Sequence, residues 1–252
     1  LKKENPAQPV HILSSVAEHK SVTQSLEAVQ NLGVEVDFLP VNEFGQVRVE
    51  DILNALKPHT KLLSFMWVNN EVGSINPISA IGKIANEKKI YFHCDATQAV
   101  GKIPVSVADA HVDLLSLSAH KMYGPKGVGA LYVRQSNPKV QIQPLIHGGG
   151  QERGLRSGTL NVPGIVGLGK AAELCEQHLQ EEHERLTQMR EKFWQDLKAA
   201  LPEVKLNGHP SERAANNLNI QLPKNLALTL GKLQALAFSA GSACGSGSTS
   251  LS

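Results

Sequence analysis

Three residues of this chain carry side chains that can act together: an acid, an amine and a thiol. Asp95 ends an apolar run, Lys121 follows the next apolar run in the sequence Ser-Ala-His-Lys, and Cys244 lies in a Gly/Ser-rich segment near the end. A carboxylate can keep the ring nitrogen of an aromatic cofactor protonated, an amine can bond its aldehyde, and a thiol can attack a substrate held there. The set predicts pyridoxal phosphate chemistry on sulfur.

Each of the three residues also has an ordinary structural explanation. Asp95 can cap a helix after a strand, Lys121 can be a solvated lysine before a turn, and Cys244 can be an incidental thiol in a flexible tail. Two other kinds of phosphate site do not fit. Residues 123–127 lack the spacing of a nucleoside triphosphate P-loop, and residues 147–150 do not match the dinucleotide fingerprint.

Composition excludes several functional classes. The chain has 252 residues, of which 41% are hydrophobic and 19% charged, and no apolar stretch is long enough to cross a bilayer. A net charge of +2 is too small to indicate nucleic acid or membrane binding. Three cysteines suit a reducing compartment, so we expect a cytoplasmic location, with an organellar matrix as the alternative. Cys94 and Cys175 are expected to be inert, and no metal site is predicted.

Short apolar runs alternate with amphipathic stretches through the first half of the chain. This pattern predicts an α/β fold with a mostly parallel sheet that helices cover on both faces. Ligands of such sheets gather beyond the carboxyl ends of the strands. Asn70, Asp95 and Lys121 all fall near a predicted strand end. The expected strands are 10–14, 34–41, 61–68, 90–94, 112–118 and 129–133, and the expected helices are 21–32, 49–56 and 78–88.

A second, smaller α+β unit is expected toward the end of the chain. Apolar residues recur at helical spacing over 165–197, which predicts one long helix or two helices end to end. Pro202 is expected to stop this helix, and a strand-like stretch follows at 217–222. The predicted domains are 1–178, a cofactor-binding large domain, and 179–252, part of a small domain.

Six short segments, in order along almost the whole chain, resemble the cysteine desulfurases, and in particular the group that supplies sulfur for iron–sulfur clusters and thiolated RNA. Each motif alone is weak, but the six together are specific. They are Ala-Glu-His-Lys at 17–20, Asn-Asn-Glu-Val-Gly at 69–73, His-Cys-Asp-Ala-Thr-Gln at 93–98, Ser-Ala-His-Lys at 118–121, the Gly-rich 148–159 and Gly-Ser-Ala-Cys at 241–244.

The resemblance implies a fold-type I homodimer that uses pyridoxal 5'-phosphate to remove sulfur from L-cysteine, giving L-alanine and a persulfide. It implies catalytic roles for Lys121 as the Schiff-base lysine and for Cys244 as the sulfur acceptor, and it implies that His19 stacks on the cofactor ring. Because a thiol near pKa 8.5 is mostly protonated at neutral pH, our hypothesis is that a nearby group such as His19 also takes the thiol proton. The implied cofactor contacts are Asn70 and Gln98 to the phenolic oxygen, Asp95 to the ring nitrogen, Ser118 and His120 to the phosphate, and Thr159 to the phosphate of the partner subunit's cofactor.

The implied partners are L-cysteine, a second copy of the chain, and a sulfur-acceptor or iron–sulfur scaffold protein, without direct contact to nucleic acid or membrane. Members of this family are longer at both ends, so we expect a truncated relative. The tail at 245–249 also departs from the family's usual residues. Two alternatives stay open: a selenocysteine lyase, and a non-catalytic homologue that acts as a sulfur-transfer scaffold.

Overall fold

The described part of the chain, residues 9–223, 237 and 239 of this computed structural model, contains a large and a small sheet. The large sheet has the strand order β2-β1-β3-β4-β5-β6, and only the β5–β6 pair is antiparallel. Its strands are β1 (His11–Ser15), β2 (Glu35–Leu39), β3 (Thr60–Met66), β4 (Tyr91–Asp95), β5 (Leu114–Ser118) and β6 (Gly129–Val133). The small sheet pairs β7 (Lys205–Asn207) with β8 (Asn219–Gln221).

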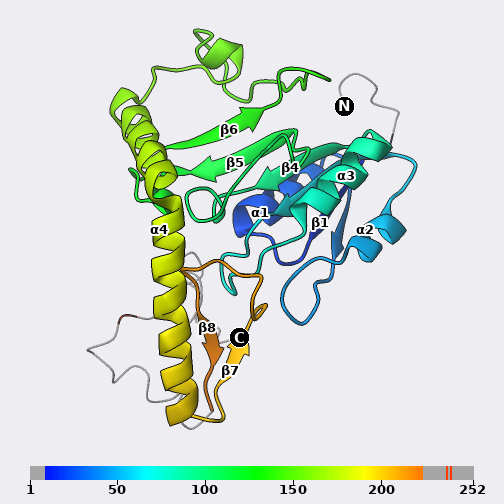
Figure 1. Cartoon of the computed structure of the whole chain (residues 1–252). Helices are drawn as coiled ribbons and strands as arrows, with labels where there is room; N and C mark the ends of the chain where they lie inside the picture. Colours follow the sequence, from blue (N-terminus) through cyan, green and yellow to red (C-terminus); the bar gives the residue numbers. More distant parts are fainter. Residues whose placement is uncertain (1–8, 224–236, 238, 240–252) are drawn as a thin grey trace.

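Four α-helices and two short 3₁₀ helices connect the strands of the described residues (Figure 1). The predicted α/β fold with a mostly parallel sheet is confirmed. The long helical pattern forms a single helix of 39 residues. The helices are α1 (Lys20–Gln30), α2 (Val49–Ala55), α3 (Ile78–Lys88), η1 (Ala119–Met122), η2 (Glu152–Gly154) and α4 (Val162–Ala200).

The two faces of the large sheet are covered by different helices. Successive residues of a strand point to opposite faces. Ile12 and Val36 pack with Leu26 of α1, whereas the core on the other face joins Leu13 to Ile81 of α3. Because both faces bury apolar side chains, the strands read as nearly continuous apolar runs, which is why sequence patterning located them.

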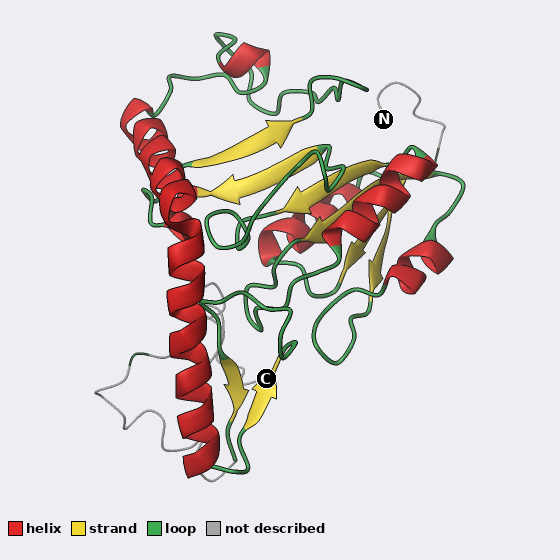
Figure 2. Cartoon of the chain, in the orientation of Figure 1, coloured by secondary structure: helices red, strands yellow, loops and turns green. Residues whose placement is uncertain are grey.

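Helix α4 links the two sheets. Figure 2 shows its upper half beside the large sheet and its lower half beside the β7–β8 hairpin. The side chains of Arg190 and Lys198 fasten the hairpin segment to the helix, because they donate hydrogen bonds to the carbonyl oxygens of Ala214 and Val204 at 3.2 and 3.1 Å. The proposed division after residue 178 falls inside this helix.

Strand β6 forms one edge of the large sheet. Among the described strands it pairs with β5 alone. Four of its five residues are exposed, among them Leu131 and Tyr132. An apolar edge strand of this kind is unusual for a protein surface.

Two helical glycines are expected to respond oppositely to alanine. A Cβ on Gly82 of α3 would lie 1.8 Å from the carbonyl oxygen of Ala110, so backbone would have to move. We expect Gly82→Ala to lower the free energy of unfolding by about 1 to 3 kcal/mol. A Cβ on Gly169 of α4 meets nothing within 4 Å, so Gly169→Ala should raise it by about 0.5 to 1 kcal/mol. Urea unfolding measures both, and equal effects would contradict the packing of α3 described here.

Candidate active site at the carboxyl edge of the sheet

Four neighbouring parallel strands, β1, β3, β4 and β5, end at the same edge of the large sheet. His19 follows β1 by four residues, Asn70 follows β3, Asp95 is the last residue of β4, and Lys121 lies in η1 directly after β5. Parallel strands bring their carboxyl ends together. The fold therefore brings these four side chains, which are up to about a hundred residues apart in sequence, to one edge.

Asp95 is a buried carboxylate at the centre of this edge. Only 7% of the residue is exposed, and its Oδ1 accepts a hydrogen bond from the backbone N–H of Thr97 at 2.9 Å. Its Oδ2 accepts no hydrogen bond within the described residues. The carboxylate thus caps the turn after β4, as was considered for Asp95 from the sequence. Its second oxygen can accept a hydrogen bond from another donor. Gln98, half-buried in that turn, accepts a hydrogen bond from Lys102.

Lys121 is half-buried, and its ammonium makes no hydrogen bond or ion pair with any residue that the structure describes. Lys102, which sequence reasoning missed, lies close enough to Lys121 for the two positive charges to repel each other. Burial and the positive charge of Lys121 lower the pKa of Lys102 to about 8. Its position four residues after Gln98 is the sequence signal that could have identified it, since a turn brings such residues together.

Ser118 and His120 form a hydrogen-bonded pair beside Lys121. The Ser118 Oγ and the His120 Nδ1 are 2.8 Å apart. When the hydroxyl donates to Nδ1, the ring proton is on Nε2. Because His120 is exposed, this N–H is available to an acceptor such as a phosphate oxygen.

His19 is the N-cap of α1, so the helix-start explanation describes its local structure. Its Nδ1 accepts a hydrogen bond from the backbone N–H of Ser21 at 3.2 Å and lies 2.8 Å from the Ser21 Oγ. Its Nε2 makes no hydrogen bond within the described part of the chain. Asp95 pairs with Met66 of β3, and Leu62 lies four residues earlier on the same face of that strand. Leu62 packs against the cluster that contains Leu26 of α1. Asp95 therefore points to the face of the sheet that α1 covers.

Glu18 is a second buried carboxyl group near Asp95, and sequence reasoning did not single it out. It is 8% exposed, and its Oε1 accepts hydrogen bonds from the Met66 N–H at 2.9 Å and the Ser15 hydroxyl at 3.0 Å. Its Oε2 is buried and has no partner within the described residues. Burial, with a contribution from the charge of Asp95, raises the pKa of Glu18 to about 8. At neutral pH this group is therefore a carboxylic acid.

Two predicted site residues are not part of this arrangement. Thr159 is exposed on the segment between η2 and α4, which Figure 1 shows beyond β6. The contact predicted for Thr159 is with the cofactor of a partner subunit, and the side chain is exposed to solvent on this subunit. Cys244 lies outside the described residues.

A cavity of about 400 Å³ lies between α4 and the turn after β4. Its walls include Lys102, Met122 and Cys175, but neither Asp95 nor Asn70. Cys175 is half-buried, and burial raises the pKa of its thiol. Cys175 is therefore a poor nucleophile at neutral pH.

A family model described as Aminotransferase class-V matches residues 3–251 of this chain. The chain belongs to this family. The cysteine desulfurase IscS of Clostridium botulinum is 48% identical over 244 residues, which are 94% of this chain and 60% of that relative. The chain thus spans about 60% of the length of this relative. The resemblance to the cysteine desulfurases is confirmed.

Solved structures of similar proteins confirm the fold-type I architecture of this class-V family member. A structure described as a NifS-like protein superposes with a TM-score of 0.82 at 38% identity, covering 88% of this chain and 60% of that one. A structure described as SspA in complex with cysteine has a TM-score of 0.81 at 34% identity, covering 97% of this chain and 67% of that one.

None of the described helices is long and apolar enough to cross a membrane. In the same part of the chain, no group of three or more His, Cys, Asp or Glu side chains is arranged to hold a metal ion.

Proposed function

We propose that this chain is part of a cysteine desulfurase that uses pyridoxal 5'-phosphate to transfer sulfur from L-cysteine to Cys244. The observation that carries the proposal is the edge of the sheet, where a buried carboxylate lies beside a lysine that has no hydrogen-bond or ion-pair partner among residues 9–223. The relatives named cysteine desulfurase and the related structure with bound cysteine support the same substrate.

The residues at the edge fit pyridoxal phosphate. The Asp95 Oδ2 lacks a donor among the described residues and can accept the N–H of a protonated pyridine ring. The Lys121 amine likewise has no partner in the part of the chain that the structure describes, and it can bond an aldehyde. Ser118 and His120 together suit a phosphate: while the Ser118 hydroxyl donates to Nδ1, the His120 Nε2–H is the available donor, and the hydroxyl can become a second donor by turning toward the phosphate. His19, Asn70 and Gln98 complete the proposed contacts, the first with the ring and the other two with its phenolic oxygen.

When bound, the cofactor supplies an electron sink that makes the substrate's Cα proton acidic. The Lys121 Nζ is then the base that takes this proton and returns one to the product. The Asp95 carboxylate holds the proton on the ring nitrogen. The His19 Nε2 is proposed to take the proton from the Cys244 thiol, because an ordinary thiol with a pKa near 8.5 is mostly protonated at neutral pH.

The sulfur transfer balances without an oxidant or a reductant. The Cys244 thiolate attacks the sulfur of L-cysteine, an S–S bond forms, and the bond between that sulfur and the substrate's Cβ breaks. The electron pair of the broken bond is protonated to give L-alanine. The sulfur remains as a persulfide on Cys244, ready for an acceptor protein.

The remaining assignments belong to the same proposal. A homodimer would bring Thr159 to the cofactor of the partner subunit, and its exposure is compatible with that role. An iron–sulfur scaffold or another sulfur acceptor would take the persulfide. A reducing compartment, the cytoplasm or an organellar matrix, would keep the acceptor thiol free. Residues 1–178 would form the large domain and 179–252 part of the small one.

Cys244→Ser should abolish persulfide formation while leaving cofactor binding intact. We expect alanine formation from L-cysteine by the complete polypeptide to fall to below about 1% of wild type, because a serine hydroxyl cannot accept the sulfur and burial raises the thiol pKa of the two cysteines in the described residues, Cys94 and Cys175. The matched control is Cys175→Ser, which should keep more than about half of the activity. Mass spectrometry of the alkylated protein locates the added sulfur, and a persulfide on Cys175 would contradict the assignment.

The same measurements separate the alternatives. A selenocysteine lyase would release selenide from L-selenocysteine and leave L-cysteine unchanged. A scaffold without catalytic activity would bind no cofactor and acquire no persulfide.

A further inference from the structure

The loop at residues 69–74, which carries Asn70 to the candidate active site, is held by a segment almost 150 residues later in the chain. Three consecutive carbonyl oxygens of this loop accept hydrogen bonds from that segment. Glu71 O accepts from the side chains of Asn217 at 3.0 Å and Asn219 at 3.1 Å, Val72 O accepts from Arg213 at 3.2 Å, and Gly73 O accepts from the backbone N–H of Ala214 at 2.9 Å.

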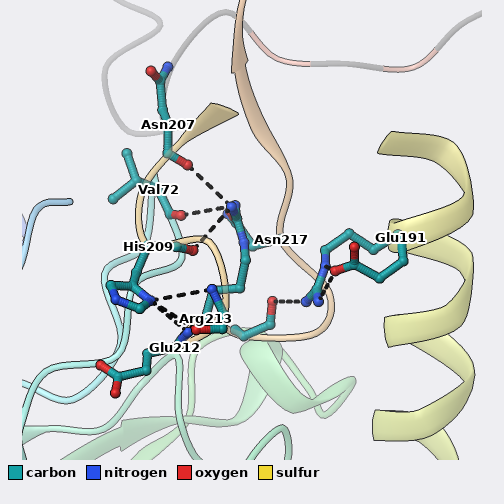
Figure 3. A network of polar contacts seen from close by, with 10 residues as sticks. Val72, Glu191, Asn207, His209, Glu212, Arg213 and Asn217 are labelled. Atoms are coloured by element: carbon teal, nitrogen blue, oxygen red, sulfur yellow. Dashed lines mark hydrogen bonds and ion pairs between the residues drawn. The ribbon is translucent and has the colours of Figure 1, made fainter. Parts of the chain in front are cut away.

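Arg213 is the buried charge at the centre of this contact. It is 3% exposed, and Figure 3 shows its guanidinium facing the oxygen atoms around it. It has no carboxylate partner within the described residues, and burial lowers its pKa to about 10. Its acceptors are Asn207 O at 3.3 Å, His209 O at 3.5 Å, Val72 O at 3.2 Å and the Asn217 Oδ1 at 3.0 Å.

Burying a cation without a carboxylate partner costs free energy of desolvation, so an apolar side chain of similar volume would be less costly at a core position. An arginine side chain can do what an apolar one cannot, because its planar guanidinium donates hydrogen bonds to several carbonyl oxygens at fixed angles. Here the fork joins both ends of the β7–β8 connection to the loop of the large sheet. Gly73, with a φ of +76°, allows the close approach, because a Cβ there would lie 2.5 Å from the Asn217 Oδ1.

The other side of the loop is anchored near His19. The Asn69 side chain donates to Ala17 O at 3.2 Å and accepts from the backbone N–H groups of Glu71 and Val72, both at 2.9 Å. Asn70 therefore lies between two anchors, one on the β1–α1 turn and one on the hairpin unit.

We propose that Arg213 is a positioning residue that, with Asn217, fixes residues 69–74 so that Asn70 stays at the carboxyl edge of the sheet. The proposal rests on the proposed function, which assigns Asn70 to the phenolic oxygen of the cofactor. Arg190 of α4 binds the hairpin unit from the other side, because it donates to the carbonyl oxygen of Ala214 and makes no hydrogen bond to residues 69–74. Through Arg213 and Asn217, the unit that follows α4 and precedes Cys244 is coupled to the cofactor site.

The test compares Arg213→Met, which keeps the aliphatic volume without the donors, with Arg213→Lys and Asn217→Ala. The matched control is Arg190→Met, because Arg190 is a similarly buried arginine that bonds Ala214 but not the loop. The first readout is amide hydrogen exchange at residues 71–73 without cofactor, relative to the amides of β4. The second is the dissociation constant and visible absorption maximum with pyridoxal phosphate, with Asn70→Ala as the reference.

We expect Arg213→Met to speed exchange at residues 71–73 by about tenfold or more, relative to β4, and Asn217→Ala by severalfold. Arg213→Met and Asn70→Ala should shift the absorption maximum in the same direction, and the double variant should add little. Unchanged loop exchange in Arg213→Met, or an equal change in Arg190→Met, would overturn the proposal. If Arg213→Met does not fold, Arg213→Lys and Asn217→Ala decide by the same exchange criterion.

The two proposals fail differently in this experiment. A wild-type protein without a cofactor band, or an Asn70→Ala variant with an unchanged band, would count against the proposed function. Loop exchange would still decide the role of Arg213.

Discussion

Lys121→Ala is expected to lower sulfide release from L-cysteine by at least about a thousandfold in the complete polypeptide. The substitution removes the amine that bonds the cofactor and the base that takes the substrate proton, and positioned proton transfer alone contributes about 10² to 10⁴-fold. The fold should tolerate the change, because the ammonium has no hydrogen-bond or ion-pair partner in the described part of the chain.

Two measurements check this expectation. Sulfide is quantified under saturating L-cysteine, and borohydride reduction followed by peptide mapping locates covalently held cofactor. Wild type should carry the label at Lys121, and Lys121→Ala should carry none. Lys126→Ala is the control, because Lys126 is exposed in the same Gly/Pro-rich turn. Undiminished sulfide release by Lys121→Ala would refute the assignment.

Glu18→Gln is expected to remove a large pH dependence of stability. The folded state holds the Glu18 proton up to a pKa of about 8, against 4.5 for an unperturbed glutamate. The folded pKa is the higher of the two, so the folded state binds more protons between these values. Stability from this group is therefore present at low pH and is lost as the pH rises through the window from 4.5 to about 8.

Integrated from pH 5 to pH 9, this effect amounts to roughly 4 kcal/mol. Urea unfolding at both pH values should show that wild type loses about this much more stability than Glu18→Gln, which cannot ionise. The comparison cancels the other titrating groups, provided that they are unchanged. Parallel pH profiles for the two proteins would show that Glu18 is ionised in the folded state.

The sheet could be predicted from sequence because its strands bury apolar side chains on both faces, and the six expected runs match the observed strands to within two residues at every end. Strand β7 was missed. It has only three residues, Lys205–Asn207, and pairs with β8 alone, so it leaves no alternation to detect. The sequence predicted either one long helix or two helices end to end, and α4 is a single helix. Its only proline, Pro163, lies in the first turn, where it does not break a helix.

The candidate site was predictable only where a strand end marks it. Asn70, Asp95 and Lys121 follow apolar runs, so the parallel sheet brings them together. Arg213 carries no such signal, and although Glu18 lies three residues after β1, its residue type does not indicate burial. A glutamate or an arginine is usually exposed, and each of these two becomes buried through partners that are 48 to 141 residues away. Their role depends on tertiary packing, which local pattern does not encode.

The exposed edge of β6 is expected to affect the solubility of this polypeptide. A row of backbone N–H and C=O groups without strand partners among the described residues, flanked by Leu131 and Tyr132, is a template for adding another strand. In a longer polypeptide, another segment of the same chain can cover this edge. Where this edge stays uncovered, we expect expressed forms of the sequence to self-associate through β6.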